Sequence, residues 1–159
     1  MNPKPARIYK YQRRLPHYQS DKPLFVTFCT RDRRILPDAA REVVLAHCHH
    51  DRGTKLLLHA AIVMPDHAHL LLSILRDPDG WPYELRSILQ SLKSASAHSV
   101  NKLLGTSDPV WHPESFDHTL RSYEGLEETR EYIRQNPVRK GLVKTPEDYP
   151  WLWLEERIL

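Results

Sequence analysis

The chain has 159 residues, the usual size of one globular domain. Hydrophobic residues make up 40% of it and charged residues 27%, proportions that exclude bulk disorder and a fibrous repeat. Two cysteines are too few for the disulfide framework of a small secreted protein. The N-terminal residues lack the apolar stretch of a signal peptide, and the longest apolar runs, 56–64 and 70–75, are too short to span a bilayer. We therefore expect a soluble, cytoplasmic protein with no membrane association.

Positive charge is concentrated near the N-terminus. The whole chain carries a net charge of +3, yet residues 1–34 contain nine lysines and arginines against two aspartates, a local charge of +7. A basic arm on a nearly neutral body is compatible with contacts to nucleic-acid phosphate. A solvated tail explains the same pattern, so charge alone leaves both interpretations open.

Side-chain patterns predict the secondary structure. Runs rich in β-branched and aromatic residues predict strands, and apolar residues three or four positions apart predict helices. In chain order we predict a strand over 24–30, a helix over 37–50, strands over 55–63 and 67–74, a helix over 82–104, a short strand near 110–111, a strand over 116–120 and a helix over 123–135. The last helix would begin after Ser122 as its cap and end near Asn136, because Pro137 disfavours helical geometry in the residue before it.

This order is β-α-β-β-α-β followed by a further helix. The expected fold class is therefore α+β, with a ferredoxin-like antiparallel sheet in the split βαβ arrangement. Two helices would cover one face of the sheet, and the added helix would leave the other face partly open for a site. Along the chain we expect a basic arm over 1–20, one domain over 21–148, and an aromatic tail over 149–159 that packs on the domain.

Two histidines on the third predicted strand are candidate metal ligands. Side chains alternate along a strand, so His67 and His69 point to the same face. Two neighbouring imidazoles can bind one divalent metal ion, although two ordinary core or surface histidines would give the same pattern. Asp66, just before them, is expected either as a turn residue or as a hydrogen-bond partner of a histidine.

The last predicted helix carries a second candidate pair. Tyr132 and Asn136 are four residues apart and so share one helix face. A tyrosine and an amide in this arrangement suit a nucleophile and a metal ligand. The alternative is a half-buried packing residue and a helix cap.

Taken together, these motifs resemble a known family. The segments 64–72 (MPDHAHLLL), 111–121 (WHPESFDHTLR) and 132–142 (YIRQNPVRKGL) are similar to those of the REP-associated tyrosine transposases, which are single-tyrosine HUH transposases. The resemblance extends from about Leu15 to Trp151. It identifies the predicted domain over 21–148 as an HUH transposase domain.

The resemblance implies cleavage and rejoining of single-stranded DNA. His67 and His69 match the HUH histidines, Tyr132 matches the catalytic tyrosine, and Asn136 matches the polar residue that completes the metal site. It further implies Mg²⁺ or Mn²⁺ as cofactor, a 5′-phosphotyrosine intermediate with a free 3′-OH, and hairpin-forming palindromic repeats as substrate. A monomer and a homodimer are both compatible with it.

The resemblance also gives weight to basic residues as DNA contacts. The expected contacts are Lys10, Arg13, Arg14, Arg31, Arg33, Arg34, Arg139 and Lys140. Two other functions remain open from the sequence. One is a nucleic-acid-binding ferredoxin-like module without catalysis, and the other is a metal-dependent phosphodiesterase that forms no covalent intermediate.

Overall fold

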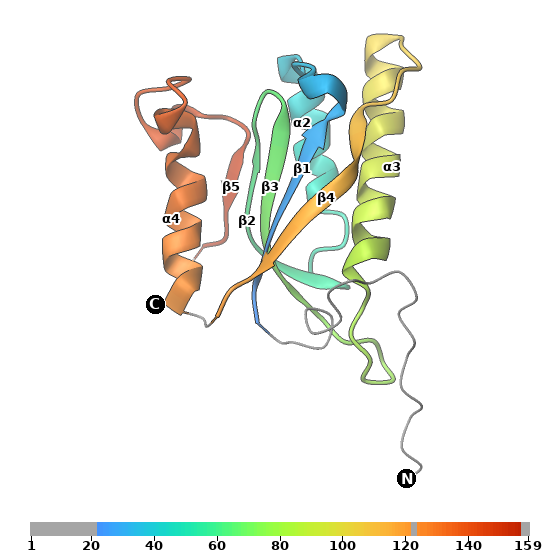
Figure 1. The fold of residues 1–159 in the computed structure, drawn as a ribbon, viewed down its shortest axis with the longest axis vertical. Helices are drawn as coiled ribbons and strands as arrows, with labels where there is room; N and C mark the ends of the chain where they lie inside the picture. The colour runs from blue at the N-terminus through green and yellow to red at the C-terminus, as the bar shows by residue number, and fades with distance from the viewer. Residues whose placement is uncertain (1–21, 122–123, 157–159) are drawn as a thin grey trace.

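The computed structural model describes residues 22–121 and 124–156, and it has the predicted α+β class (Figure 1). The expected basic arm and Ser122 lie outside these ranges. Five antiparallel strands form one sheet in the order β4-β1-β3-β2-β5. The elements are β1 (Leu24–Thr30), η1 (Arg31–Arg33), α2 (Asp38–Cys48), β2 (Leu56–Val63), β3 (His67–Ile74), α3 (Leu85–Leu104), β4 (Trp111–Thr119), α4 (Glu124–Arg139), η2 (Pro146–Asp148) and β5 (Leu152–Leu154).

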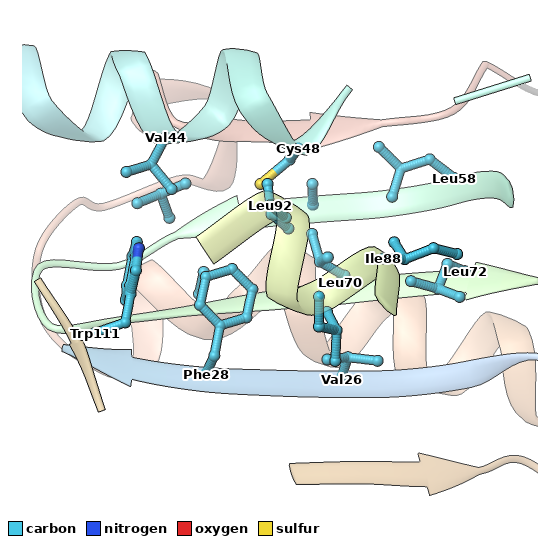
Figure 2. Close-up of a cluster of buried hydrophobic side chains, with 14 of the residues drawn as sticks. Val26, Phe28, Val44, Cys48, Leu58, Leu70, Leu72, Ile88, Leu92 and Trp111 are labelled. Carbon is cyan, nitrogen blue, oxygen red and sulfur yellow. The ribbon is translucent and has the colours of Figure 1, made fainter. Parts of the chain in front are cut away.

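One face of the sheet packs against α2 and α3. On β1 every second residue is fully buried, because alternate side chains point to the same face. Val26 and Phe28 point into this core with Leu70 of β3, below Val44 of α2 and Ile88 of α3 (Figure 2). This apolar layer fixes the register between β1 and β3, since a slip of one residue would turn every core side chain to the opposite face.

The opposite face packs against α4. Ile133 of α4 is fully buried among Ile62 of β2 and Leu71 of β3. In Figure 1, α4 and α3 lie on opposite sides of the strands. Within the described residues, none of the helices has the length and apolar character needed to cross a membrane.

The end of α4 differs from the sequence prediction. We expected the helix to end near Asn136, but it continues through Pro137 to Arg139. Proline cannot donate a backbone hydrogen bond, so the last turn is closed by other bonds: the amide of Lys140 donates to the carbonyl of Asn136 at 3.0 Å and that of Leu142 to Pro137 at 2.9 Å. The residue before a proline prefers an extended backbone, but Asn136 and Pro137 are both buried. The free energy gained by this burial outweighs the local preference, so the helix continues.

Two further strands differ from the prediction. The short strand near 110–111 and the strand over 116–120 form one continuous strand, β4. Part of the aromatic tail forms β5, which pairs with β2. The hydroxyl of Tyr149 donates to the carbonyl of Val63 at 2.6 Å, so the segment before β5 is also attached to the sheet.

Candidate active site

His67 and His69 lie side by side on the face of the sheet that α4 partly covers. Their ring centroids are 4.7 Å apart, and both side chains are nearly buried. The register places Cys29 opposite His67 and Thr27 opposite His69 on the neighbouring strand β1. The two imidazoles therefore lie on the same face of the sheet, as the alternation of side chains along a strand predicts.

One ring nitrogen of each histidine is held by a neighbouring side chain. Nδ1 of His67 lies 2.7 Å from Oδ1 of Asp66, and Nδ1 of His69 lies 2.8 Å from Oγ1 of Thr27. These contacts orient the rings and leave Nε2 as the remaining nitrogen of each. Asp66 thus combines both roles considered from the sequence: it lies in the turn before β3 and partners a histidine. Its carboxylate also pairs with Arg33 at 3.1 Å.

Burial keeps both imidazoles neutral. It lowers the pKa of His69 to about 3, with further contributions from the neighbouring His67 and the positive charge of Arg139. The pKa of His67 is also lowered, mainly by burial, although the Asp66 carboxylate acts in the opposite direction. A neutral imidazole has a lone pair available to a metal ion at neutral pH.

Helix α4 brings Tyr132 and Asn136 to the same side of the sheet. The ring centroid of Tyr132 lies 6.5 Å from that of His69 and 6.1 Å from that of Phe25. Tyr132 is 50% exposed, whereas Asn136, one turn further along, is 2% exposed. Solvent can thus reach the tyrosine side chain, whereas the amide of Asn136 is buried.

The Asn136 amide is poorly satisfied by the protein. Within the described part of the chain its Nδ2 has no hydrogen-bond partner, and its Oδ1 makes one long contact of 3.4 Å with Arg139. A buried amide with so few protein partners is suited to binding a water molecule or an ion. The oxygen and nitrogen of an amide are exchanged by a simple flip, so the oxygen can take either position.

These residues fit a divalent cation. Two neutral imidazoles, each with Nδ1 held by a partner, and one buried amide oxygen form a donor set that suits Mn²⁺ better than the oxygen-preferring Mg²⁺. Among residues 22–121 and 124–156 there is no group of three or more histidine, cysteine or acidic side chains that could hold a metal. A third protein ligand at this site would therefore be of another chemical type, and Asn136 is the residue expected in that role.

Three of the basic residues expected to contact DNA surround this site. Arg33 pairs with Asp66, and the positive charge of Lys140 contributes to the lowered pKa of His67. The Arg139 guanidinium lies 4.1 Å from the centroid of the Tyr132 ring. These cations lie on both sides of the histidine pair, from η1 and from the end of α4.

The other expected contacts are placed differently. Arg31 is exposed on η1, and Arg34 lies 3.8 Å from the carboxylate of Asp108. The remaining three lie outside the described residues; they are Lys10, Arg13 and Arg14. Of the members of the predicted basic set within the described residues, the structure therefore places Arg33, Arg139 and Lys140 near the histidines.

Some residues of the site were not identified from the sequence. Phe25 stacks on His69, with centroids 5.0 Å apart and an angle of 28° between the rings. Thr27 fixes the orientation of the same histidine. Alternation along β1 groups these two on one face, but only the register with β3 places them beside His69.

The comparisons with known proteins agree with this fold. A REP-associated tyrosine transposase of Escherichia coli is 27% identical over 94 residues, which cover 59% of this chain and 52% of that protein. A Haemophilus influenzae protein whose name places it in the same class is 25% identical over 97 residues, covering 58% of this chain and 55% of that protein. The chain thus spans about half the length of the curated relatives it matches. No established family profile matches it.

One solved structure supports the same conclusion. It is described as a REP-associated tyrosine transposase bound to a REP hairpin, and it superposes with a TM-score of 0.66 at 23% identity, covering 91% of this chain and 82% of that one. This match confirms the expected ferredoxin-like α+β fold. Together with the two curated relatives, it confirms the resemblance to the REP-associated tyrosine transposases.

Proposed function

We propose that this chain is a metal-dependent transposase and endonuclease for single-stranded DNA, with Tyr132 as the nucleophile. The observation that carries the proposal is the position of Tyr132, half-exposed and with its ring 6.5 Å from that of His69 on the open sheet face. A cation held beside this tyrosine by two neutral imidazoles and an amide oxygen would offset the charge that develops when the hydroxyl attacks a phosphate.

The cleavage step exchanges one phosphate ester for another. The hydroxyl oxygen of Tyr132 attacks the phosphorus of one phosphodiester and loses its proton. The bond from phosphorus to the 3′ oxygen breaks, and that oxygen leaves as a 3′-OH after taking up a proton. The products are a 5′-phosphotyrosine diester and a free 3′ end.

Rejoining reverses the exchange with another strand end. A 3′-OH attacks the phosphotyrosine, the bond from phosphorus to the tyrosine oxygen breaks, and Tyr132 regains its proton. The number of phosphate ester bonds stays constant, so cutting and joining need no nucleotide cofactor.

The side chains around Tyr132 have separate roles in this proposal. Nε2 of His67, Nε2 of His69 and the Asn136 amide oxygen would hold Mg²⁺ or Mn²⁺. The bound cation supplies positive charge that offsets the charge of the phosphate oxygens in the transition state. Asp66 and Thr27 keep the two imidazoles in the orientation that presents Nε2.

The proposed substrate is single-stranded DNA that folds into a hairpin at palindromic repeats. The basis is the name of the solved structure with the same fold, which is bound to a REP hairpin. Arg33, Arg139 and Lys140 would contact phosphates around the site. Arg31 and Arg34, with the arm residues Lys10, Arg13 and Arg14, would extend that contact, and the protein would act in the cytoplasm as a monomer or homodimer.

The test is to trap the covalent intermediate. The protein is incubated with a single-stranded hairpin carrying unpaired flanks, with Mn²⁺ or Mg²⁺, and run on a denaturing gel. We expect an adduct in which the DNA is attached through its 5′ phosphate. Cleavage without an adduct would favour a phosphodiesterase that uses water, and binding without cleavage would favour a non-catalytic module.

A further inference from the structure

We propose that the part of the open sheet face formed by β1 and β4 binds one unpaired nucleobase, stacked on the ring of Phe116. The base belongs to the single-stranded flank beside the phosphate that Tyr132 attacks. The inference rests on the proposed function, and it adds a position at which the protein senses an individual base.

The strand register places Phe116 on the same face as the histidines. Phe116 on β4 lies opposite Thr27 on β1, and side chains directly opposite in an antiparallel pair share one face. Thr27 in turn contacts His69 on the next strand at 2.8 Å. Phe116 is therefore two strands away from His69 across the sheet.

Phe116 is open to solvent, in contrast to the aromatic residue nearest to it on this face. Its side chain is 60% exposed, whereas Phe25 is half-buried between His69 and Tyr132. An isolated exposed phenylalanine is common on protein surfaces. This one lies two residues before His118 on the same face, and His118, also exposed, lies opposite Phe25, whose ring contacts Tyr132.

Helix α4 packs on the part of this face formed by β2, β3 and β5. β4 forms the sheet edge opposite β5; in Figure 1 its upper part lies beside α3, and its lower end runs toward the start of α4. A strand whose phosphate lies at Tyr132 can therefore run across β1 toward β4.

Charge complementarity identifies the occupant as a nucleic acid. The cations of Arg33, Arg139 and Lys140 lie around the histidine pair at one border of this face. Cationic groups that follow a backbone, next to aromatic rings on which bases stack, are the usual means of binding single strands. A purely apolar partner would bind the Phe116 ring alone and would make no use of the positive charges of Arg33, Arg139 and Lys140.

Binding of DNA with single missing bases tests the inference. A hairpin with an unpaired flank is prepared as a series in which each flank position in turn is abasic, and the Kd of each is measured by fluorescence anisotropy. For the wild type, one abasic position should weaken binding by about 5- to 100-fold, the range expected for one base stacked on an aromatic ring. For Phe116→Ala, intact DNA should bind weaker by a similar factor, and removal of that same base should have no further effect.

Two variants serve as controls. Phe116→Trp keeps a stacking surface and should restore the sensitivity to that one base. Leu103→Ala removes another exposed apolar side chain, on α3 in the opposite layer, and should bind every DNA like the wild type. Thermal unfolding of all variants establishes that they fold alike.

The outcomes separate this inference from the proposed function. If Phe116→Ala retains the wild-type dependence on every base, or instead changes the oligomeric state of the protein, the base site is wrong even where the wild type forms the covalent adduct. If the Phe116-dependent position is found but no adduct forms, the base site holds and the tyrosine mechanism fails. If the wild type binds no single-stranded DNA, both fail.

Discussion

Arg139 links Tyr132 to Asn136 across the last turn of α4. Its guanidinium lies 4.1 Å from the centroid of the Tyr132 ring and donates to the backbone carbonyl of the same residue at 2.9 Å. A weaker contact of 3.4 Å reaches Oδ1 of Asn136. One cation therefore holds the aromatic ring that carries the proposed attacking oxygen and touches the amide proposed to bind the metal.

Replacing this cation should slow cleavage more than it weakens binding. For Arg139→Ala we expect adduct formation to slow by about 3- to 30-fold, the effect of removing a cation–π interaction of about 0.5–2 kcal/mol. The rate of adduct formation at saturating DNA is measured together with the Kd. Lys102→Ala, which removes a cation from α3, is the matched control and should leave the rate unchanged. If the rate of adduct formation and the affinity for DNA decrease by the same factor, Arg139 acts only by binding phosphate.

Removing a single hydroxyl should abolish the covalent step. Tyr132→Phe keeps the ring and its contacts with Phe25 and Arg139, so folding and DNA binding should persist. Adduct and cleavage should both disappear on denaturing gels. Tyr83→Phe removes a hydroxyl from another half-buried tyrosine, away from α4, and should cleave normally. An adduct formed by Tyr132→Phe would disprove the assignment of the nucleophile.

The carboxylate beside His67 should influence metal affinity. Asp66→Asn keeps the shape of the side chain but removes the charge that orients the imidazole, and removal of such a partner typically costs about 10- to 100-fold in metal affinity. Binding of Mn²⁺ is followed by electron paramagnetic resonance, which detects the free ion. Asp38→Asn changes an exposed carboxylate on α2 and should bind Mn²⁺ like the wild type. Unchanged affinity in Asp66→Asn would argue against His67 as a ligand.

Replacing Asn136, whose buried amide is poorly satisfied by the protein, should raise the stability of the protein and abolish its function. Asn136→Leu replaces a buried polar group whose Nδ2 lacks a partner in the described chain, so without metal the free energy of unfolding should rise by about 1–3 kcal/mol. The same variant should lose Mn²⁺ binding and cleavage. Chemical denaturation gives the first quantity. Gln135→Leu in the same helix, where the amide bonds Glu131, corrects for helix propensity. A large decrease in the stability of Asn136→Leu would mean that the protein already satisfies the amide.

The basic arm should contribute affinity by binding phosphates. Deleting residues 4–14 removes Lys10, Arg13 and Arg14 together with two further cations. The Kd for single-stranded DNA should rise, and the plot of log affinity against log salt should become shallower by about 0.7 for each phosphate that the arm had neutralised. The same affinity and the same salt slope after truncation would show that the arm does not bind DNA.

Local patterns were sufficient for the strands that carry the histidines. The bounds of β1 and β3 agree with the prediction because β1 is rich in β-branched and aromatic residues and β3 contains a run of aliphatic ones. The pairing of His67 with His69, and of Tyr132 with Asn136, followed from the periods of strand and helix. Periodicity gave only the shared faces, and the expected roles of these four residues came from the resemblance to the transposase family.

Non-local features could not be predicted in this way. That Thr27 and Phe25 lie beside His69 depends on the register between β1 and β3, which is set by the packing of both strands against α2 and α3. The same is true of the contact made by Lys93 on α3. Its ammonium group donates to the carbonyl of His112 at 2.6 Å and so joins α3 to β4.

The proline inside α4 makes the geometry of the site dependent on the assembled sheet. A helix with an internal proline and few apolar residues outside Ile133 would have little helical content as an isolated peptide, because a short helix in water depends on its own hydrogen bonds. Tyr132 and Asn136 therefore come into register only when β2 and β3 support the helix. In the proposed mechanism, a nascent or partly unfolded chain would carry the tyrosine without the arrangement that makes it reactive, and cleavage of DNA would be restricted to fully folded molecules.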